Sequence, residues 1–303
     1  MPVVPASYPF RFHGFPPELL IWYFYMVMEK LVIFTDLDGT LLDHAGYSFE
    51  MAVPSLQRVK EQDIPLVICS SKTRKEIEAY RKKLDNHHPF ISENGGGIFI
   101  PKGYFSFDLS HPKHEIITGR NYHVIRLGAP YEDLRKALEE LRRDGFQVRG
   151  FGDMSFEELA QTAHMTLSEA KMAKQRDFDE PFLHTGPAYR LSRLLRAIHD
   201  KGFKFTQGRF YHILGNSNKG IAVSILIELY KQKFQDMGIV TVAIGDSPND
   251  KPMLQRVDRP ILVKKHDGTY EPTIKIPNLI RADGIGPEGW NRSIKTLLTA
   301  YGS

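Results

Sequence analysis

The sequence predicts an α/β protein in which a mainly parallel sheet is interrupted by a second, strand-rich domain. Two observations support this prediction. Short apolar runs that end in polar residues alternate with helical segments, and from about residue 114 the pattern changes to many short strands. The chain has 303 residues, which is long enough for two domains. We therefore expect a core formed by residues 28–113 and 215–303, with an inserted α/β domain at 114–214.

The core begins with KLVIFTD, a short apolar run ending in carboxylate that indicates a buried central strand. FEMAVPSLQRVKEQD and TRKEIEAYRKKLDN have helical spacing, and IPLVICSS between them indicates a second buried strand. PFISENGGGIFI predicts a strand, a glycine-rich turn and another strand. After the insertion, NKGIAVSILIELYKQKF predicts a helix and IVTVAIGDSPND another buried strand ending in acids.

The inserted domain is predicted to form a small sheet of its own with helices on one face. Its expected strands are YHVIRLG, FQVRGFGD, EPFLH, FKFTQ and RFYHILG. Its expected helices are YEDLRKALEELRRD, SFEELAQTAH, TLSEAKMAKQR and AYRLSRLLRAIHDKG.

Residues 1–27 are interpreted as an N-terminal extension outside the two domains. Their apolar stretch ELLIWYFYMVM is only about half a membrane span, and a secretory cleavage signal is lacking. A membrane-surface or oligomer-contact helix is the alternative, and a homodimer is left open.

Composition narrows the class of protein. The net charge is +4 and no long Lys/Arg block occurs, so we expect neither a nucleic-acid nor a membrane partner. The single cysteine, Cys69, excludes an intrachain disulfide and a cysteine-based zinc cluster. It lies in an apolar run, which favours a buried structural thiol in a cytosolic protein. The twelve histidines show no metal-ligand spacing, and surface or core roles are expected for His164 and His212.

Four polar clusters follow predicted strands or open a predicted helix. They are DLDGT, Ser70–Ser71, Lys219 and GDSPND. Ligands of open parallel sheets bind beyond the carboxyl ends of the strands, so these clusters are expected at one edge. Each alone has a bland explanation, such as a solvated acid pair, a helix cap or a surface lysine. Their occurrence together in this order argues against coincidence.

The chemistry of this set is coherent. Asp36, Asp246 and Asp250 offer hard oxygen ligands for Mg²⁺, and Asp36 can also attack phosphorus. Asp38 can protonate the leaving alcohol and then activate water. Ser70 offers a hydroxyl to a phosphate, and Lys219 a positive charge that offsets the repulsion between carboxylate and phosphate.

DLDGTLLD, Ser70, Lys219 and GDSPND resemble the four motifs of the haloacid dehalogenase superfamily, from Met28 onward. The resemblance implies a Rossmann-like core, Mg²⁺, Asp36 as nucleophile and Asp38 as acid/base. It implies metal binding by Asp36, the Asp38 backbone carbonyl and Asp246, supported by Asp250. The insertion resembles the cap of the Cof-type subgroup.

Further segments resemble the mannosyl-3-phosphoglycerate phosphatases. These are SSKTRKEIEAY, ENGGGIFIP, RGFGDMSFEELA, AKQRDFDEPF and GRFYHILG. Gln207 departs from the pattern, because a second glycine is expected there. The resemblance implies hydrolysis of mannosyl-3-phosphoglycerate to mannosylglycerate, a compatible solute. Alternatives are a phosphatase of glucosyl-3-phosphoglycerate or sucrose phosphate, a phosphomutase, and a non-catalytic sugar-phosphate sensor.

Such a substrate carries a phosphate, a carboxylate and a hexose, and arginine is the natural carboxylate clamp. Of the arginines in these segments, which include Arg176, we expect Arg149 and Arg209 to bind the carboxylate. The remaining substrate-binding candidates lie at strand ends and turns: Ser70, Ser71, Glu93, Asn94, Gly95 and Asn249. For Glu93 to Gly95, the alternative is a turn stabilised by the Asn94 side chain.

Overall fold

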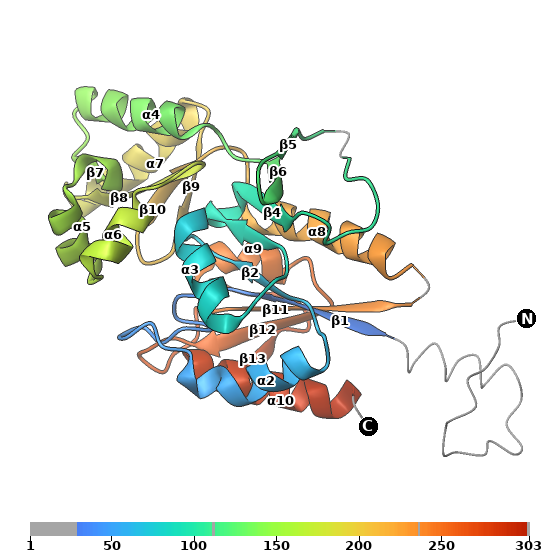
Figure 1. The fold of residues 1–303 in the computed structure, drawn as a ribbon. Coiled ribbons are helices and arrows are strands. Elements are labelled where there is room, and N and C mark those ends of the chain that lie inside the picture. The colour runs from blue at the N-terminus through green and yellow to red at the C-terminus, as the bar shows by residue number, and fades with distance from the viewer. Residues whose placement is uncertain (1–28, 111–112, 236, 302–303) are drawn as a thin grey trace, which may run out of the picture.

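The computed structural model describes residues 29–110, 113–235 and 237–301, so the predicted extension at 1–27 lies outside the described residues. Within them the chain forms a nine-stranded sheet and a separate four-stranded sheet (Figure 1). This confirms the predicted α/β class with a core and a cap. None of the described helices combines the length and apolar composition needed to cross a membrane.

The large sheet is parallel through its centre and antiparallel at one edge. Its strands, in spatial order, are β13 (Ile280–Ile285), β12 (Arg259–Lys264), β11 (Ile239–Gly245), β1 (Lys30–Thr35), β2 (Leu66–Cys69), β3 (Phe90–Ser92), β4 (Gly97–Pro101), β6 (Tyr122–Arg126) and β5 (Ile116–Thr118). All pairs from β13 to β3 are parallel, and those from β3 to β5 are antiparallel. The predicted strands of both core halves therefore join in one sheet, in which β1 lies between β11 and β2.

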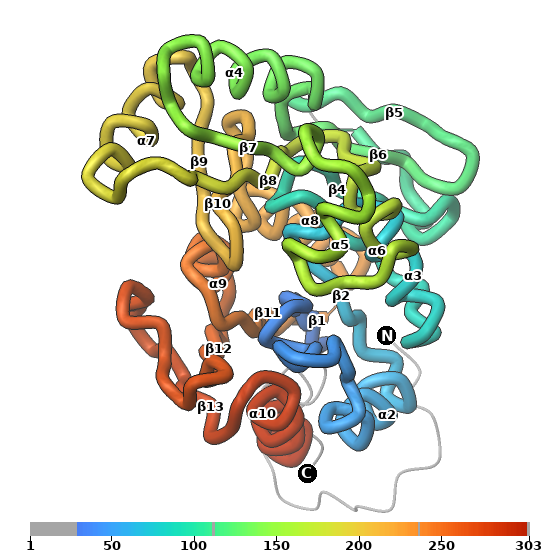
Figure 2. The backbone as a smooth tube through the Cα atoms, turned by 90° about the vertical axis from the view of Figure 1, so that its left-hand side faces the viewer, coloured from blue at the N-terminus to red at the C-terminus, as the bar shows by residue number. Residues whose placement is uncertain are grey.

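Helices cover both faces of this sheet, which explains why its central strands are uninterrupted apolar runs. Leu31 and Ile33 pack on the face covered by α2 (Val53–Glu61), α3 (Arg74–Leu84) and α10 (Gly286–Tyr301). Val32 and Phe34 pack on the other face, against α8 (Lys219–Lys233) and α9 (Lys251–Leu254). In both views α2 and α10 lie side by side beneath the sheet (Figure 2).

The cap contains a four-stranded antiparallel sheet. Its order is β7 (Val148–Gly150), β8 (Asp179–His184), β10 (Tyr211–Leu214) and β9 (Lys204–Gln207). One face packs on α4 (Tyr131–Arg143) and α7 (Leu191–Asp200), with Phe182 and Ile213 buried between them. The short helices α5 (Phe156–Ala163) and α6 (Leu167–Ala173) form a second, smaller apolar cluster.

Short 3₁₀ turns connect several of these elements. They are η1 (Glu50–Ala52), η2 (Glu93–Gly95), η3 (Phe151–Asp153), η4 (Ala188–Arg190) and η5 (Pro248–Asp250). Two of them, η2 and η5, follow the carboxyl ends of β3 and β11 and carry residues of the site.

The first two strands after residue 114, the predicted start of the cap, belong to the core sheet. Strands β5 and β6, which the sequence analysis placed in the insertion, extend the core sheet instead, and Val124 of β6 pairs with Phe99 of β4. The apolar cluster of the core, to which Val124 adds, favours this placement. A short strand does not reveal from sequence which sheet it joins, because its partners are distant in the chain.

The two connections between core and cap run close together. A Cβ atom on Gly215 would lie 2.5 Å from the backbone nitrogen of Ala129, so the outgoing and returning chains touch there. Before this point, the N–H groups of Leu127 and Gly128 both donate to the Gly96 carbonyl oxygen at 2.9 Å. We propose that the cap extends from about residue 129 to about residue 214.

The glycine-rich turn after β3 sets the position of helix α8. Asn94 and Gly95 both have positive φ, +56° and +91°. The turn lets Gly95 pass close to Asn218, whose side-chain oxygen caps α8 by accepting from the Ile221 N–H at 3.0 Å. Because Lys219 is the first residue of α8, this contact also determines where Lys219 enters the core.

Replacing Gly95 with alanine tests this close approach. A Cβ there would lie 2.2 Å from the Asn218 carbonyl oxygen, whereas at Gly103, with φ of +77°, nothing lies within 4 Å. Both alanine variants should lose about 1–2 kcal/mol from left-handed strain. Gly95→Ala should lose about 1–3 kcal/mol more through the steric clash. Urea unfolding measures both losses, and equal values would contradict the steric role of Gly95.

Candidate active site

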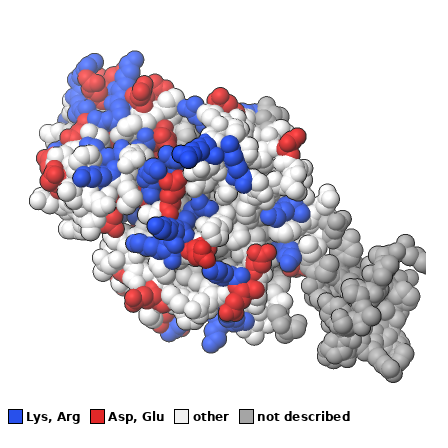
Figure 3. Space-filling view, viewed as in Figure 1, with Lys and Arg blue, Asp and Glu red and all other residues white. Residues whose placement is uncertain are grey.

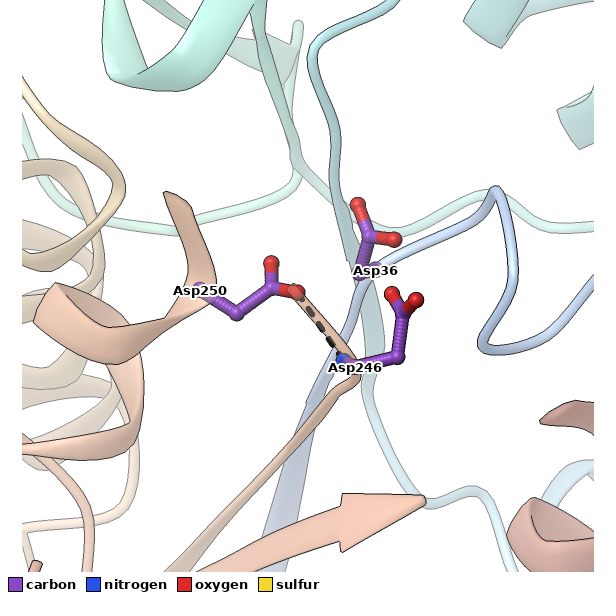
Figure 4. Close-up of side chains that lie close together, drawn as sticks. All are labelled: Asp36, Asp246 and Asp250. Atoms are coloured by element: carbon purple, nitrogen blue, oxygen red, sulfur yellow. Dashed lines mark hydrogen bonds between the residues drawn. The ribbon is translucent and has the colours of Figure 1, made fainter. Parts of the chain in front are cut away.

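Three aspartates converge at the carboxyl ends of the two central strands. Asp36 follows β1, Asp246 follows β11, and Asp250 lies at the end of η5. One carboxylate oxygen from each lies within 4.8 Å of the other two, and all three residues are buried (Figure 4). Parallel pairing produces this arrangement, because it aligns Thr35 with Ile244 and so brings the ends of both strands together.

Lys219 is the buried cation of this cluster. Its Nζ donates to Oδ1 of Asp36 and to Oδ1 of Asp250, each at 2.6 Å, and its side chain is fully buried. The second oxygen of Asp250 accepts the N–H groups of Asp246 and Ser247 at 3.0 Å. Asp250 therefore holds both the lysine and the loop that carries Asp246.

The three carboxylates, if all ionised, carry three negative charges, whereas Lys219 supplies one positive charge. Burial raises the pKa of Asp36 well above its usual range, and repulsion from Asp250 and Asp246 adds to the rise against the opposing effect of Lys219. Burial and the charge of Asp250 likewise raise the pKa of Asp246 to about 7. A divalent cation among these oxygens would supply the missing positive charge, and hard oxygen donors of this kind suit one. The residues present therefore fit a metal site.

Asp38 is held apart from the three converging carboxylates by a different lysine. Its Oδ2 lies 3.0 Å from Nζ of Lys72, which is also 3.7 Å from Glu76. Its Oδ1 is buried and has no hydrogen-bond partner in the described structure. Burial alone lowers the pKa of Lys72, but the charges of Asp38 and Glu76 raise it overall, so the ammonium form is favoured. The sequence analysis missed Lys72, which directly follows the predicted serine pair.

A cavity of about 550 Å³ lies between the core and the cap. This volume is in the range of small-molecule sites. Core residues on its wall include Asp36, Asp38, His44, Tyr47, Ser71, Lys72, Asp246, Asn249, Lys265 and His266. Cap residues include Phe151, Arg176, Pro181, Gln207, Gly208, Arg209, Phe210 and His212. Asp36, Asp246 and Asp38 thus face a space that the cap covers, whereas Asp250 lies behind them, outside the cavity lining.

The two predicted serines occupy different positions. Ser71 lines the cavity, whereas Ser70 is buried just after β2, and its Oγ accepts the N–H of Lys72 at 3.2 Å. The predicted contact of Ser70 with phosphate stays a prediction.

Of the two arginines expected to bind a carboxylate, only Arg209 lies on the cavity wall. Its Nη1 donates to the Tyr47 hydroxyl at 2.7 Å and to the Ala163 carbonyl at 2.8 Å. Arg149 lies outside the cavity lining, and its exposed guanidinium pairs with Glu158 at 2.7 Å. On the face shown in Figure 3, basic side chains lie among acidic ones.

The predicted sugar contacts of η2 take a different form in the structure. Glu93 is fully buried, and its carboxylate accepts the backbone N–H groups of residues 177–179 of the cap. Asn94 is buried beside it and joins the core to the cap by donating to Asp179 at 2.8 Å. Glu93, Asn94 and Gly95 do not line the cavity, whereas Asn249, which donates to Asn94 at 3.0 Å, does.

Arg176 and His212 both contact the carboxylate of Asp179, a residue that the sequence analysis did not single out. Arg176 is paired with Asp179 and also donates to the Ser71 carbonyl oxygen at 2.8 Å. The His212 Nδ1 lies 2.9 Å from Asp179. Because His212 also lines the cavity, its place goes beyond the core role expected for it. His164 ends α5 in the left-handed conformation.

Comparison with known proteins places the chain in a family. Residues 33–120 match the model of the haloacid dehalogenase-like hydrolases. A protein of Methanococcoides burtonii named glucosyl-3-phosphoglycerate/mannosyl-3-phosphoglycerate phosphatase is 47% identical over 89% of this chain and 97% of its own. Mannosyl-3-phosphoglycerate phosphatase of Pyrococcus horikoshii is 38% identical over 77% of this chain and 90% of its own.

Solved structures agree in fold. A crystal structure of a Thermoplasma acidophilum protein superposes with a TM-score of 0.61, covering 91% of this chain and 99% of the other, at 19% sequence identity. The identity and coverage of the curated relatives, with the acidic cluster beneath a cap, lead to one conclusion. The chain belongs to the family of glucosyl-3-phosphoglycerate/mannosyl-3-phosphoglycerate phosphatases, within the haloacid dehalogenase-like hydrolases.

Proposed function

We propose that the protein is a Mg²⁺-dependent phosphomonoesterase that converts mannosyl-3-phosphoglycerate into mannosylglycerate and phosphate. The observation that carries this proposal is the buried cluster of Asp36, Asp246 and Asp250 with Lys219, of which Asp36 and Asp246 face a capped cavity. The names of two relatives support the choice of substrate, because the proteins of Methanococcoides burtonii, 47% identical, and Pyrococcus horikoshii, 38% identical, are named as phosphatases of hexosyl-3-phosphoglycerates.

The proposed reaction has two steps at phosphorus. Asp36 attacks the phosphorus atom and forms an aspartyl-phosphate, while the bond to the ester oxygen breaks and Asp38 gives its proton to the leaving alcohol. A water molecule then gives a proton to Asp38 and attacks the same phosphorus, which releases phosphate and restores Asp36. Lys219 offsets the repulsion between carboxylate and phosphate.

Asp36, Asp246 and Asp250, with the Asp38 backbone carbonyl, are the groups that would hold the metal. Bound there, Mg²⁺ would neutralise negative charge on the phosphate and help to orient it. We favour Mg²⁺ because it is bound through a few carboxylates together with substrate phosphate and retained water.

The identity of the hexose is the part of this proposal for which a second candidate exists. The Methanococcoides burtonii relative is named for both glucosyl and mannosyl substrates, whereas the Pyrococcus horikoshii relative is named for the mannosyl substrate alone. Action on glucosyl-3-phosphoglycerate is therefore the second candidate. We also infer a cytosolic location from Cys69, the single cysteine, which is buried and free.

The first experiment measures phosphate release from mannosyl-3-phosphoglycerate, glucosyl-3-phosphoglycerate and hexose phosphates with Mg²⁺. We expect turnover of the hexosyl-3-phosphoglycerates, and Asp36→Asn should reduce kcat by at least about 10³-fold because an amide is a poor nucleophile. Preference for another phosphate ester would overturn the proposed substrate but not the reaction. Undiminished turnover by Asp36→Asn would overturn the assignment of the nucleophile.

Metal binding is tested by thermal unfolding with and without MgCl₂. At tenfold excess over Kd, the cation should stabilise the native protein by about 1.4 kcal/mol and raise Tm. Asp246→Asn should lose most of this rise, because one buried ligand is gone. Asp200→Asn, which removes an exposed carboxylate of the cap, is the control and should keep it. An equal rise in all three proteins would contradict the assigned site.

The two predicted arginines form a matched pair for the carboxylate contact. Arg209→Gln should raise KM for the hexosyl-3-phosphoglycerates about tenfold, since charge-assisted hydrogen bonds are the stronger class. Arg149→Gln should change KM less than about twofold, because an exposed ion pair contributes little. Steady-state kinetics measure both, and the reverse order would show that the clamp is Arg149.

A further inference from the structure

His212 is a buried cavity residue that the proposed reaction at Asp36 does not use. It lies on β10 between Tyr211 and Ile213, which pack on the helix-covered face of the cap sheet. Because side chains alternate along a strand, His212 belongs to the opposite face, where it pairs in register with Pro181 of β8. Both His212 and Pro181 line the cavity.

Asp179 determines the orientation of this histidine. Its Oδ2 lies 2.9 Å from the His212 Nδ1 and accepts from the Asn94 amide at 2.8 Å, while its Oδ1 pairs with Arg176. Burial alone raises the pKa of Asp179, but the charge of Arg176 and the hydrogen bonds from His212 and Asn94 outweigh it and lower the pKa. An ionised carboxylate only accepts hydrogen bonds, so the Nδ1 of His212 must carry the proton.

The same carboxylate orders a chain of amides that ends at the cavity. Asn94 must turn its NH₂ group toward Asp179, so its oxygen faces Asn249 and accepts the Asn249 NH₂ at 3.0 Å. The Asn249 oxygen is thereby left without a partner in the described structure, although it is buried. In the same way, a neutral His212 with a proton on Nδ1 leaves Nε2 as an acceptor, for which the described residues provide no donor.

These acceptors contrast with the cationic groups elsewhere on the wall. Lys72, Arg209 and Lys265 line the cavity and suit the phosphate and the carboxylate of an anionic substrate. The side occupied by His212 and Asn249 instead offers acceptors, which suit a hydroxyl group. The hexosyl-glycerate half of the ester is rich in such donors.

We propose that His212, oriented by Asp179, is a specificity-determining residue whose Nε2 accepts a hydrogen bond from a hydroxyl of the hexosyl-glycerate half of the substrate. This inference rests on the proposed function and names a substrate contact within it. It predicts that His212 matters for hydroxyl-bearing esters and not for phosphate transfer itself.

The test compares two substitutions on two classes of ester. His212→Asn keeps an NH₂ group near the position of Nδ1 for Asp179 but lacks an acceptor at the position of Nε2. We expect its KM for the hexosyl-3-phosphoglycerates to rise about five- to tenfold, as for one lost hydrogen bond. Its kcat/KM for p-nitrophenyl phosphate, which lacks sugar hydroxyls, should stay within about twofold of the wild-type value. His212→Gln, whose longer side chain can place an oxygen near Nε2, should recover part of the loss.

A second measurement uses the wild-type protein, so it does not depend on the folding of a variant. Titration with mannosylglycerate should shift the ¹⁵N resonance of the His212 Nε2 and leave that of Nδ1 nearly unchanged, because only Nε2 gains a partner.

Several outcomes would overturn the inference. Equal losses on both ester classes would assign His212 a general structural role, and unchanged KM values or an unmoved Nε2 resonance would exclude the contact. If the wild-type enzyme hydrolysed p-nitrophenyl phosphate but neither hexosyl-3-phosphoglycerate, the proposed function would fail and the inference with it. If the wild-type enzyme hydrolysed these substrates and His212→Asn had no effect, the inference would fail while the proposed function would stand.

Discussion

The buried ammonium group of Lys219 is the interaction on which the rest of the site depends. Three carboxylates within a few ångströms repel one another and are poorly solvated, so a buried cation stabilises the meeting of the strand ends. Lys219 joins Asp36 of the first core half to Asp250 of the second at 2.6 Å each. It reaches them because Gly95 lets the turn after β3 approach the start of α8. The charge balance of the site thus depends on the backbone conformation at Gly95, because that turn places Lys219 at the carboxyl edge of the sheet.

A second buried polar network joins the core to the cap. Glu93 accepts three successive N–H groups of the cap, Asp179 binds Asn94 of the core, and Arg176 reaches the Ser71 carbonyl. Buried polar groups of this kind are costly unless every partner is present, so they specify one docking geometry. They explain why Glu93 and Asn94, which the sequence analysis expected at the sugar, are found in the contact between core and cap instead. These contacts hold the cap in a fixed position relative to Asp36.

Much of the site could be predicted from the sequence because it depends on strand ends. The central strands are apolar runs terminated by acids, and parallel strands must bring those ends to one edge; the structure indeed brings Asp36, Asp246 and Asp250 together. The catalytic and metal-binding roles of these residues remain predictions. The strand β12, the strand β13 and the helix α10 were not assigned individually from the sequence, although their region was included in the core.

The remainder depended on contacts between segments distant in the chain. Lys72 pairs with Asp38, 34 positions away, and His212 pairs with Asp179, 33 positions away. No local sequence pattern predicts either contact. Arg149 and Arg209 look alike in sequence, yet one pairs with Glu158 on the surface and the other lies on the cavity wall. Strand β6, predicted in the inserted domain, joins the core sheet for the same reason, because its pairing with β4 is seen only in the folded chain.

The adjacent crossing of the chain at Ala129 and Gly215 has an evolutionary consequence. A segment whose two ends touch can be lengthened, shortened or exchanged without separating the strands on either side of it. The core sheet can therefore tolerate a different cap while its acidic edge remains intact. In this chain, an exchanged cap would leave the buried carboxylate of Glu93 unpaired unless it presented backbone N–H groups there. A change of cap can therefore alter the wall of the cavity while the acidic edge of the sheet stays as it is.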